Sequence, residues 1–395
     1  MNREKHVAFC GYNVFPHGFA QTQRLLLIAK GLEINNCNTL VLCRYCTYQE
    51  HLNTVSGSGF FEGIHYKYCS GSSSRPTSFV HRNILKIYGL FNEFFVLLKK
   101  RVTGKLDYIF VTTNSFDSVL YYSLVAKLLF TRSVIDNMEF WSAVKRSKWS
   151  LGEKLHDQLS PILYSKVICI SDFLVNQARK TRSKSNILKI PAIVDYSKFD
   201  GPDGSTAGQN VNEYLLFCGS AVYFPVIDFI IESFEKIHDK KTALIIVSSN
   251  GGKSDFEKLN LRISGSAKKE LIELKSNLPY SNLVDLYKKS IALLIPLRQN
   301  NEDKARFPHK LGEYCASKGI IITTNNGEVP NYFTDFQNAL VANSFDSDLF
   351  AEKMDYAITN KSNLNQIRLN AYKTGLENFD YRINGSGIYK FLFNN

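Results

Sequence analysis

The residues with the clearest chemical potential lie in one segment, from Arg306 to Gly319. We expect Pro308 to be the first residue of a helix, where its missing N–H is harmless, and Gly319 to follow the end of that helix. The helix start then has free backbone N–H groups, with Arg306 before them and Lys310 one turn inside. Such an arrangement binds anions, so the segment predicts a phosphate site.

A carboxylate lies next to this predicted phosphate site. Glu313 follows Lys310 by three residues, so both side chains lie on nearly the same face of the helix. A carboxylate at that place suits the two hydroxyls of a ribose, and the segment therefore predicts a bound nucleoside diphosphate. The alternative is an ordinary helix that carries an exposed Lys–Glu pair.

A second turn that contains glycines spans residues 11–24, after the first predicted strand. Glycines between a strand and a helix let backbone N–H groups approach a ligand at the carboxyl edge of a parallel sheet. The spacing is not Gly-x-Gly-x-x-Gly, and the second predicted strand ends in Cys43-Arg44-Tyr45 without an acidic residue. Both observations disfavour a dinucleotide-dependent oxidoreductase.

The elements that position these residues alternate between strands and helices, which is typical of parallel sheets flanked by helices. Strands are predicted at residues 6–10, 39–43, 108–112, 133–136, 167–170, 214–218, 242–248, 259–263, 292–295 and 320–324, and helices at 21–32, 118–130, 226–237, 281–288 and 308–318. Ser171 or Asp172 is expected to cap a further helix. The fold class predicted is α/β, with two Rossmann-like domains that face a central cleft.

Turn-forming residues interrupt this alternation between residues 198 and 212. We therefore predict four parts: an N-terminal domain (1–198) that binds the acceptor, a linker (199–212), a C-terminal domain (213–375) that binds the nucleotide, and a tail (376–395) that packs back on the N-terminal domain.

The composition is that of an ordinary globular protein, with 44% hydrophobic and 21% charged residues. No run of eighteen apolar residues and no signal-peptide core occurs, which favours the cytoplasm. The eight cysteines are scattered through mostly apolar segments, as expected for reduced, buried thiols. Cys43 and Cys46 form a lone Cys-x-x-Cys without a second pair or a nearby histidine, so we predict no metal site.

Several motifs occur in an order that spans nearly the whole chain. They are the glycine turn with Ala20 and Arg24, Ile170-Ser171, residues 190–195, Phe217-Cys218-Gly219, Leu278-Pro279-Tyr280, residues 293–296, and the Phe-Pro-x-Lys-x-x-Glu-Tyr segment that starts at Phe307. In these motifs the chain resembles the retaining glycosyltransferases of GT-B architecture, in particular the large family 4 that builds bacterial surface polysaccharides. The resemblance implies that Glu313 binds the ribose of a sugar nucleotide, that the helix start holds the diphosphate, and that residues 278–280 flank the base.

The chain departs from this family in two places. The family commonly carries Glu-x7-Glu, but the position eight before Glu313 is Ala305; Glu302 and Asp303 lie close to it. Many relatives place Arg and Lys after the opening strand of the second domain, where this chain has none in residues 219–225. The charge on the leaving diphosphate is therefore assigned to Arg306 and Lys310, since metal-free transfer needs protein cations there.

The resulting site assignments follow the resemblance and the positions of the strand ends. The donor-binding residues are Gly18, Gly219, Ser220, Leu278, Pro279, Tyr280, Arg306, Phe307, Pro308, Lys310, Leu311 and Glu313. The acceptor-side residues are Phe15, His17, Asn137 and Glu139. The catalytic residues are Glu139, Arg306 and Lys310, and no metal or cofactor is expected beside the nucleotide-sugar co-substrate. Asp136, in the same strand end as Asn137, is equally well explained as a polar loop residue.

The net charge of +12 admits nucleic acid, an anionic membrane or polyanionic ligands as partners. No helix-turn-helix and no basic sheet with stacking aromatics is recognisable, which disfavours nucleic acid. The segment from Arg82 to Lys105 places Ile84, Ile87, Tyr88, Phe91, Phe94, Phe95 and Leu98 on one helical stripe and ends near Lys99, Lys100 and Arg101. Such a helix fits the headgroup region of an anionic leaflet, and equally a buried helix whose basic end complements its own dipole.

The predicted function is transfer of a sugar from a nucleoside-diphosphate sugar to a lipid-linked or polysaccharide acceptor. We expect retention, a role in cell-surface polysaccharide synthesis, and a peripheral place on the inner face of the cell membrane. A sugar-nucleotide 2-epimerase of the same architecture is one alternative. A catalytically silent sugar-nucleotide-binding subunit, which Ala305 would explain, is another.

Overall fold

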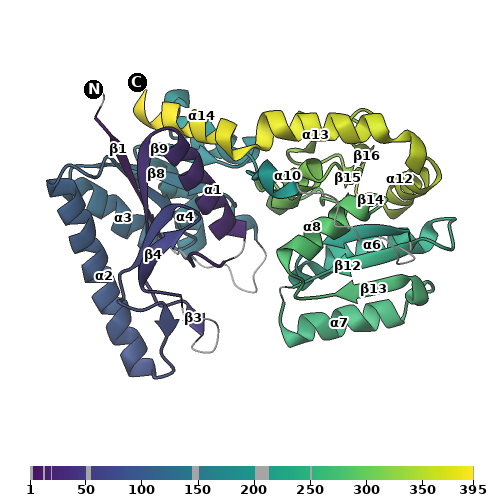
Figure 1. Cartoon of the computed structure of the whole chain (residues 1–395), viewed down its shortest axis with the longest axis horizontal. Helices are drawn as coiled ribbons and strands as arrows, with labels where there is room; N and C mark the ends of the chain where they lie inside the picture. The colour runs from purple at the N-terminus through teal and green to yellow at the C-terminus, as the bar shows by residue number, and fades with distance from the viewer. Residues whose placement is uncertain are drawn as a thin grey trace. The chain divides into compact units, whose positions relative to one another are not determined.

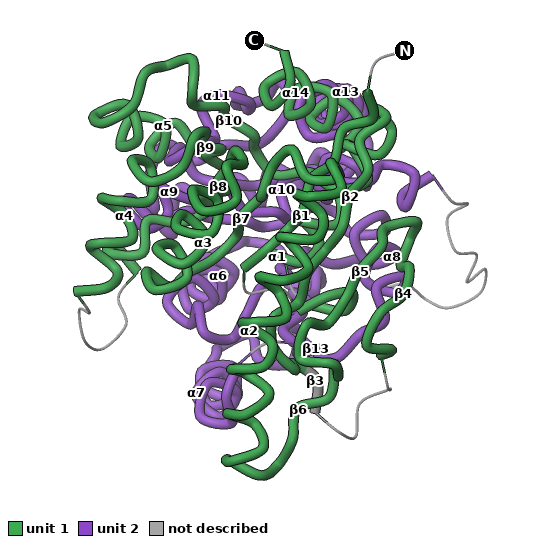
Figure 2. Tube along the Cα trace, turned by 90° about the vertical axis from the view of Figure 1, so that its left-hand side faces the viewer, with its two compact units in different colours: residues 1–193, 381–395 green, residues 194–380 purple. Residues whose placement is uncertain are grey.

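The computed structural model describes residues 3–11, 14–18, 20–49, 55–144, 151–200, 213–249 and 251–394. The chain divides into two compact units (Figure 2): unit 1 comprises residues 1–193 and 381–395, and unit 2 comprises residues 194–380. The sequence placed these boundaries at 198 and 375. Most of the predicted linker, residues 201–212, lies outside the described residues.

Unit 1 contains an eight-stranded sheet whose strand order is β10-β9-β8-β7-β1-β2-β5-β4. The strands are β1 (Lys5–Gly11), β2 (Cys37–Cys43), β4 (Ser58–Phe61), β5 (Ile64–Tyr68), β7 (Tyr108–Thr112), β8 (Arg132–Asn137), β9 (Lys166–Cys169) and β10 (Ile187–Lys189). Neighbouring strands are parallel except for the β4–β5 hairpin. The central strand β7 is buried along its whole length, because helices cover both faces of a parallel sheet. A separate pair joins β3 (Tyr48–Gln49) to β6 (Ser74–Arg75).

Among the described residues of unit 1, five α-helices lie between its strands in the sequence, and a sixth, α14, is the last element. They are α1 (Ala20–Ile34), α2 (Phe79–Val102), α3 (Phe116–Leu128), α4 (Leu151–Leu163), α5 (Asp172–Arg179) and α14 (Tyr381–Phe393). Ser171 caps α5, since its hydroxyl accepts a hydrogen bond from the N–H of Leu174. After residue 380 the chain returns to unit 1 as α14, which packs along α1 (Figure 1). The contact is close because both helices offer a glycine: a Cβ atom on Gly31 would lie 2.8 Å from the Cα atom of Gly385.

Unit 2 contains a six-stranded, fully parallel sheet of order β13-β12-β11-β14-β15-β16. Its strands are β11 (Tyr214–Cys218), β12 (Ala243–Val247), β13 (Ile272–Lys275), β14 (Ala292–Ile295), β15 (Ile321–Thr324) and β16 (Leu340–Ala342). Its helices are α6 (Phe224–Lys236), α7 (Lys253–Ser264), α8 (Tyr280–Lys289), α9 (Asn301–Ala305), α10 (His309–Ala316), α11 (Val329–Tyr332), α12 (Ser347–Thr359) and α13 (Asn365–Phe379). Leu215, Ile246 and Leu294 join helix side chains in one fully buried core.

The predicted α/β class with two parallel-sheet domains is therefore confirmed, but one predicted strand is wrong. Residues 259–263 form the last turns of helix α7, not a strand. Leu259, Leu261 and Ile263 alternate like a strand, yet Leu259 is buried whereas Leu261 is 74% exposed. The helix is stabilised at its start, because the Asp255 carboxylate accepts a hydrogen bond from the N–H of Gly252.

Candidate active site

The candidate site of unit 2 lies at the start of helix α10, where the sequence predicted it. Pro308 is the N-cap residue, with φ −61° and ψ 122°, so the helix begins at His309, one residue later than expected. The helix ends at Ala316, before the predicted residue 318, because Lys318 adopts φ 57°. The Leu311 N–H donates to the Pro308 carbonyl over 3.1 Å and closes the first turn. The start of any helix attracts anions through its backbone N–H groups and the positive end of its dipole.

Lys310 and Glu313 form a tight ion pair on this helix. The Lys310 Nζ atom lies 2.7 Å from Glu313 Oε2, and the Glu313 side chain is only 8% exposed. The Tyr287 hydroxyl donates to the same carboxylate oxygen over 3.2 Å, and the Tyr280 hydroxyl lies 3.5 Å from Oε1. The alternative of an exposed Lys–Glu pair is therefore wrong, since the carboxylate is buried between two tyrosines.

The pair is charged at neutral pH. Burial alone would raise the pKa of Glu313, but the Lys310 ammonium, with a smaller contribution from His309, outweighs burial and holds that pKa below its usual value. Burial also opposes the charged form of Lys310, and the Glu313 carboxylate raises the pKa of Lys310 above its usual value. Burial and the Glu313 charge both raise the pKa of Tyr280 and of Tyr287, which keeps both hydroxyls protonated as donors.

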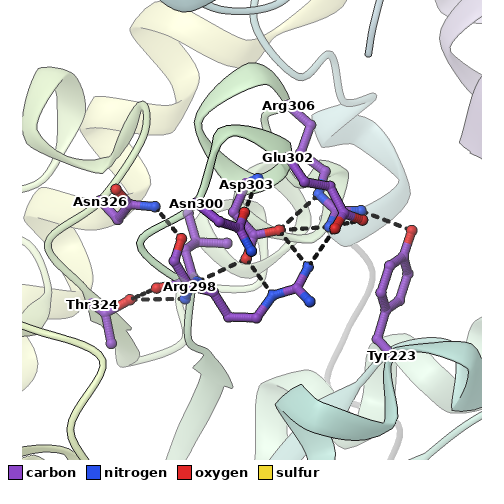
Figure 3. A network of polar contacts seen from close by, with 9 residues as sticks. Tyr223, Arg298, Asn300, Glu302, Asp303, Arg306, Thr324 and Asn326 are labelled. Atoms are coloured by element: carbon purple, nitrogen blue, oxygen red, sulfur yellow. Dashed lines mark hydrogen bonds and ion pairs between the residues drawn. The ribbon is translucent and has the colours of Figure 1, made fainter. Parts of the chain in front are cut away.

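Arg306 belongs to a second polar network, which Figure 3 shows. Its guanidinium group donates to Glu302 over 2.8 Å, to Asp303 over 2.5 Å and to the Tyr223 hydroxyl over 2.8 Å. Arg298 contacts the same two carboxylates from the other side, over 3.0 Å to Glu302 and 2.9 Å to Asp303. Two arginines and two carboxylates thus neutralise one another within this network.

This network involves residues at or beside both departures from the family pattern. Tyr223 lies in the short 3-10 helix 221–223 that follows strand β11, and the Arg306 guanidinium stacks 4.7 Å above its ring. Arg306, between α9 and α10, thereby places a positive charge near the end of β11, where residues 219–225 contain no Arg or Lys. Asp303, 2% exposed, and Glu302 both hold arginines, so neither stands as a lone carboxylate in place of the missing first glutamate.

The remaining donor-side predictions divide between surface and core. Leu278 is half-buried, whereas Pro279 and Tyr280 are exposed at the start of α8, beside Glu313. The side chains of Phe307 and Leu311 are buried in unit 2, so they do not present a surface to a donor. A donor contact through the backbone of these two residues stays a prediction. The Phe307 ring packs on Tyr332 and Phe379. Pro308, the next residue in the chain, is half-buried.

The strand end opening unit 2 provides Gly219 and Ser220, both half-buried. The Gly219 N–H donates to the Val247 carbonyl over 3.0 Å, which extends the β11–β12 pairing by one residue. The Ser220 hydroxyl caps the following 3-10 helix by accepting from the Val222 N–H over 3.3 Å. Both residues therefore have structural roles, and their contact with a donor stays a prediction.

In unit 1 the glycine turn contains one buried residue that was predicted as accessible. The Phe15 side chain is fully buried against Phe61 and Tyr66, so its predicted contact with an acceptor is wrong for this side chain. His17 is exposed, with its ring edge-on to Phe61 at 5.1 Å. Gly18 is needed for packing, since a Cβ atom there would lie 2.1 Å from the Thr22 hydroxyl oxygen.

The end of strand β8 carries the other predicted acceptor-side residues. Asp136 is buried and forms a two-point ion pair with Arg24, over 2.8 and 3.0 Å, which explains it as a structural residue. Asn137 and Glu139 are half-buried at the carboxyl edge of the sheet. The Asn137 amide donates to Ser160 over 3.4 Å, and its buried Oδ1 atom has no hydrogen-bond partner among the described residues.

Three residues of the site were not predicted from the sequence: Tyr287, Tyr223 and Arg298. Tyr287 follows Tyr280 by seven residues in a predicted helix, so two tyrosines on one face were a usable signal. Tyr223 offered no such signal, because its partner Arg306 is 83 residues away. Arg298 lies only four residues before Glu302, so that pair was within reach of a local argument. Within the described ranges, no three His, Cys, Asp or Glu side chains converge as metal ligands. None of the described helices is long and apolar enough to cross a bilayer.

Comparison with known proteins gives a match to one family model over part of the chain. Residues 207–374 match the family described as glycosyl transferases group 1. No curated protein sequence matches the chain.

Solved structures resemble the chain over its whole length. A glycosyltransferase from Rickettsia africae ESF-5 has a TM-score of 0.72 with 14% identity, over 100% of both chains. HepE of Anabaena in complex with UDP-glucose has a TM-score of 0.71 with 12% identity, over 98% of this chain and 99% of that one. Sucrose-phosphate synthase of Thermosynechococcus elongatus has a TM-score of 0.75 with 11% identity, over 99% of each chain. At these identities the likeness shows the fold, which is the GT-B fold predicted from the sequence.

Proposed function

We propose that this chain, a glycosyltransferase by its family match and its GT-B fold, takes its sugar from a nucleoside-diphosphate donor bound by unit 2. The observation that carries the proposal is the buried Lys310–Glu313 pair at the start of α10, flanked by Tyr280 and Tyr287. It offers a cation and helix N–H groups to a diphosphate and a carboxylate to a ribose. HepE, which has the same fold, was solved with UDP-glucose.

The transfer proceeds in our proposal with retention, as in family 4. Such a reaction depends on stabilising the leaving diphosphate more than on a strong base. We assign that stabilisation to Lys310. Arg306 contributes once the bound donor replaces its hydrogen bonds to Glu302 and Asp303. We expect no metal. Glu139, at the carboxyl edge of the unit 1 sheet, is our candidate for contact with the acceptor or the sugar.

A panel of UDP-, GDP-, ADP- and CMP-sugars tests the donor assignment. One nucleotide sugar is expected to raise Tm with increasing concentration, because a ligand that binds the native state stabilises it by mass action. The accepted donor is then supplied with candidate acceptors, and NMR of the product reads the anomeric configuration. Inversion would contradict retention, and no stabilisation by any donor would contradict the assignment of unit 2.

A catalytically silent donor-binding subunit is the second candidate function. It is favoured by buried Ala305 at the position of the first family glutamate and by the engagement of Glu302 and Asp303 with arginines. Stabilisation by a donor without transfer or hydrolysis would favour this candidate over the enzyme.

We further propose that the acceptor is lipid-linked and that the chain binds it at the surface of an anionic membrane. The proposed role is cell-surface polysaccharide synthesis, on the cytoplasmic side of that membrane. Helix α2 supports this, because its apolar stripe is on the surface: Ile84, Ile87, Tyr88, Phe91 and Phe95 are each 53 to 59% exposed. The reading of α2 as a buried helix is therefore wrong, since its buried residues are Gly89, Glu93 and Leu97. Its one acidic residue, Glu93, is buried against Arg44, so the charge that α2 exposes is positive and complements anionic lipid.

Exchange of Lys99 and Lys100 for glutamate is expected to weaken binding to anionic vesicles by at least about tenfold, since each basic residue near such a surface contributes about 1 kcal/mol. Arg101 is left unchanged because it donates to the carbonyls of Leu129 and Phe130. Co-sedimentation at low and high salt is the measurement, and wild-type binding should fall with salt.

The control for this experiment reverses another adjacent pair, Lys240 and Lys241, both exposed in unit 2. This variant should bind like the wild type. Serine at Phe91 and Phe95 should remove the part of binding that salt does not affect, because it removes apolar area from the membrane-facing stripe. Equal binding by all variants would exclude α2 as the membrane contact.

A further inference from the structure

A pocket of about 280 Å³ lies at the carboxyl end of strand β2, beside the start of helix α2. Three cationic side chains line it, Arg75, Arg82 and Lys86, together with Tyr45 and Thr47. The volume falls below the range of about 300 to 1,000 Å³ that is usual for sites enclosing a whole small-molecule ligand. The pocket therefore suits an anionic group, such as a phosphate or diphosphate, rather than an entire nucleotide sugar.

No acidic side chain neutralises these cations in the part of the chain that the structure describes. Within residues 55–105 the acidic residues are Glu62, which pairs with Lys30 over 2.9 Å, and Glu93, which pairs with Arg44 over 2.7 Å. A concave site lined by three positively charged side chains attracts a multiply charged anion. Two of the charges are on arginine, whose planar donor group matches the oxygens of phosphate.

Hydrogen bonds connect this pocket to the glycine turn of unit 1. The Thr47 hydroxyl lies 3.0 Å from the Tyr68 hydroxyl, which donates to the carbonyl of Phe15 over 2.8 Å. The pocket and the turn lie on the neighbouring strands β2 and β1, at the edge where parallel α/β sheets bind ligands. A group bound in the pocket would thus be held beside the predicted acceptor side of unit 1.

The exposed apolar stripe of α2 begins at the same helical turns. Ile84 and Ile87, which are 58% and 59% exposed, alternate along the helix with the pocket residues Arg82 and Lys86. We propose that the pocket binds the phosphate or diphosphate of a lipid-phosphate acceptor while the stripe contacts the membrane that contains its tail. This inference rests on the proposed function, because it specifies the chemical class of the lipid-linked acceptor.

The test compares vesicles of equal surface charge that differ in the anionic lipid. One set contains phosphatidylglycerol and the other solanesyl diphosphate, both in phosphatidylcholine. The wild type is expected to bind the diphosphate vesicles at least about tenfold more tightly, and glutamine at Arg75, Arg82 and Lys86 should bring that ratio close to one. The ratio cancels the general attraction of a basic protein to an anionic surface, which acts on both vesicle sets.

A charge-matched control replaces three exposed lysines, Lys127, Lys240 and Lys241, with glutamine and should keep the wild-type ratio. None of the three lines the pocket. A wild-type ratio of one, or equal loss of the ratio in both variants, would overturn the proposal. Displacement by inorganic pyrophosphate at the concentration of the lipid would also overturn it, since the pocket would then take a soluble anion.

This experiment needs neither a donor nor turnover. If the chain binds the diphosphate lipid selectively but transfers no sugar, the pocket assignment stands and the enzymatic proposal fails. If it transfers sugar without selecting the diphosphate lipid, the pocket assignment alone fails.

Discussion

Replacing Lys310 with alanine is expected to lower kcat by about 10²- to 10³-fold, the usual effect of removing one group that stabilises charge in the transition state. Donor binding should weaken far less. The negative charge that the Lys310 ammonium stabilises develops on the diphosphate mainly as the bond between sugar and diphosphate breaks. This ammonium is 2.7 Å from Glu313, at the start of α10. It is therefore already held beside the helix N–H groups that would receive the diphosphate.

The measurement is kcat together with the Kd of the donor, for the wild type and the variant. Lys304→Ala is the matched control, since Lys304 is an exposed lysine on the neighbouring helix α9. It should leave both quantities unchanged. Lys310→Arg should keep part of the activity, because it retains the charge. If kcat and affinity fall by the same factor, Lys310 only binds the donor and contributes nothing further to the chemical step.

Glu313→Ala is expected to raise the Kd of the donor by about tenfold or more, since hydrogen bonds to a charged group contribute roughly 1.5–3 kcal/mol. The physical reason is the fixed position of this carboxylate, which lies between Lys310, Tyr287 and Tyr280 and is nearly inaccessible to bulk water. A ribose that replaces part of these contacts would find an acceptor that is already oriented.

Calorimetry with the donor nucleotide and with its 2′,3′-dideoxy analogue separates ribose recognition from general damage. The wild type should prefer the ribose form, and Glu313→Ala should bind both nucleotides alike. Glu270→Ala, at an exposed glutamate of the same unit, is the control and should keep the preference. A variant that retains the wild-type preference would remove Glu313 from the ribose site.

The Glu313 carboxylate also predicts a direction for the pH dependence of stability. Because the folded state holds its pKa below the usual value, the unfolded chain takes up this proton first as pH falls. The stabilising contribution is therefore complete above the usual carboxyl pKa and is lost as pH falls through the lower folded value.

The sequence by itself determined the local elements and the segments that carry the chemistry. Strands such as β7 and β11 follow from short apolar runs, and the start of α10 follows from Pro308 and its neighbours, since these signals act over a few residues. The same local reasoning gave a wrong strand at residues 259–263, which form part of helix α7. The apolar residues at every second position suggested a strand, but one of them, Leu261, is exposed to solvent.

Only the tertiary structure decided which predicted residues face solvent and which charges are already paired. Phe15, Phe307 and Leu311 lie in motifs with a ligand-binding pattern, but packing buries all three. Arg306 meets Tyr223, 83 residues away, and Arg24 meets Asp136, 112 residues away. Such contacts cannot be predicted from residue types and spacing, because burial and ion pairing depend on which distant elements the fold brings together. Burial and ion pairing in turn set the free energy of a charged side chain.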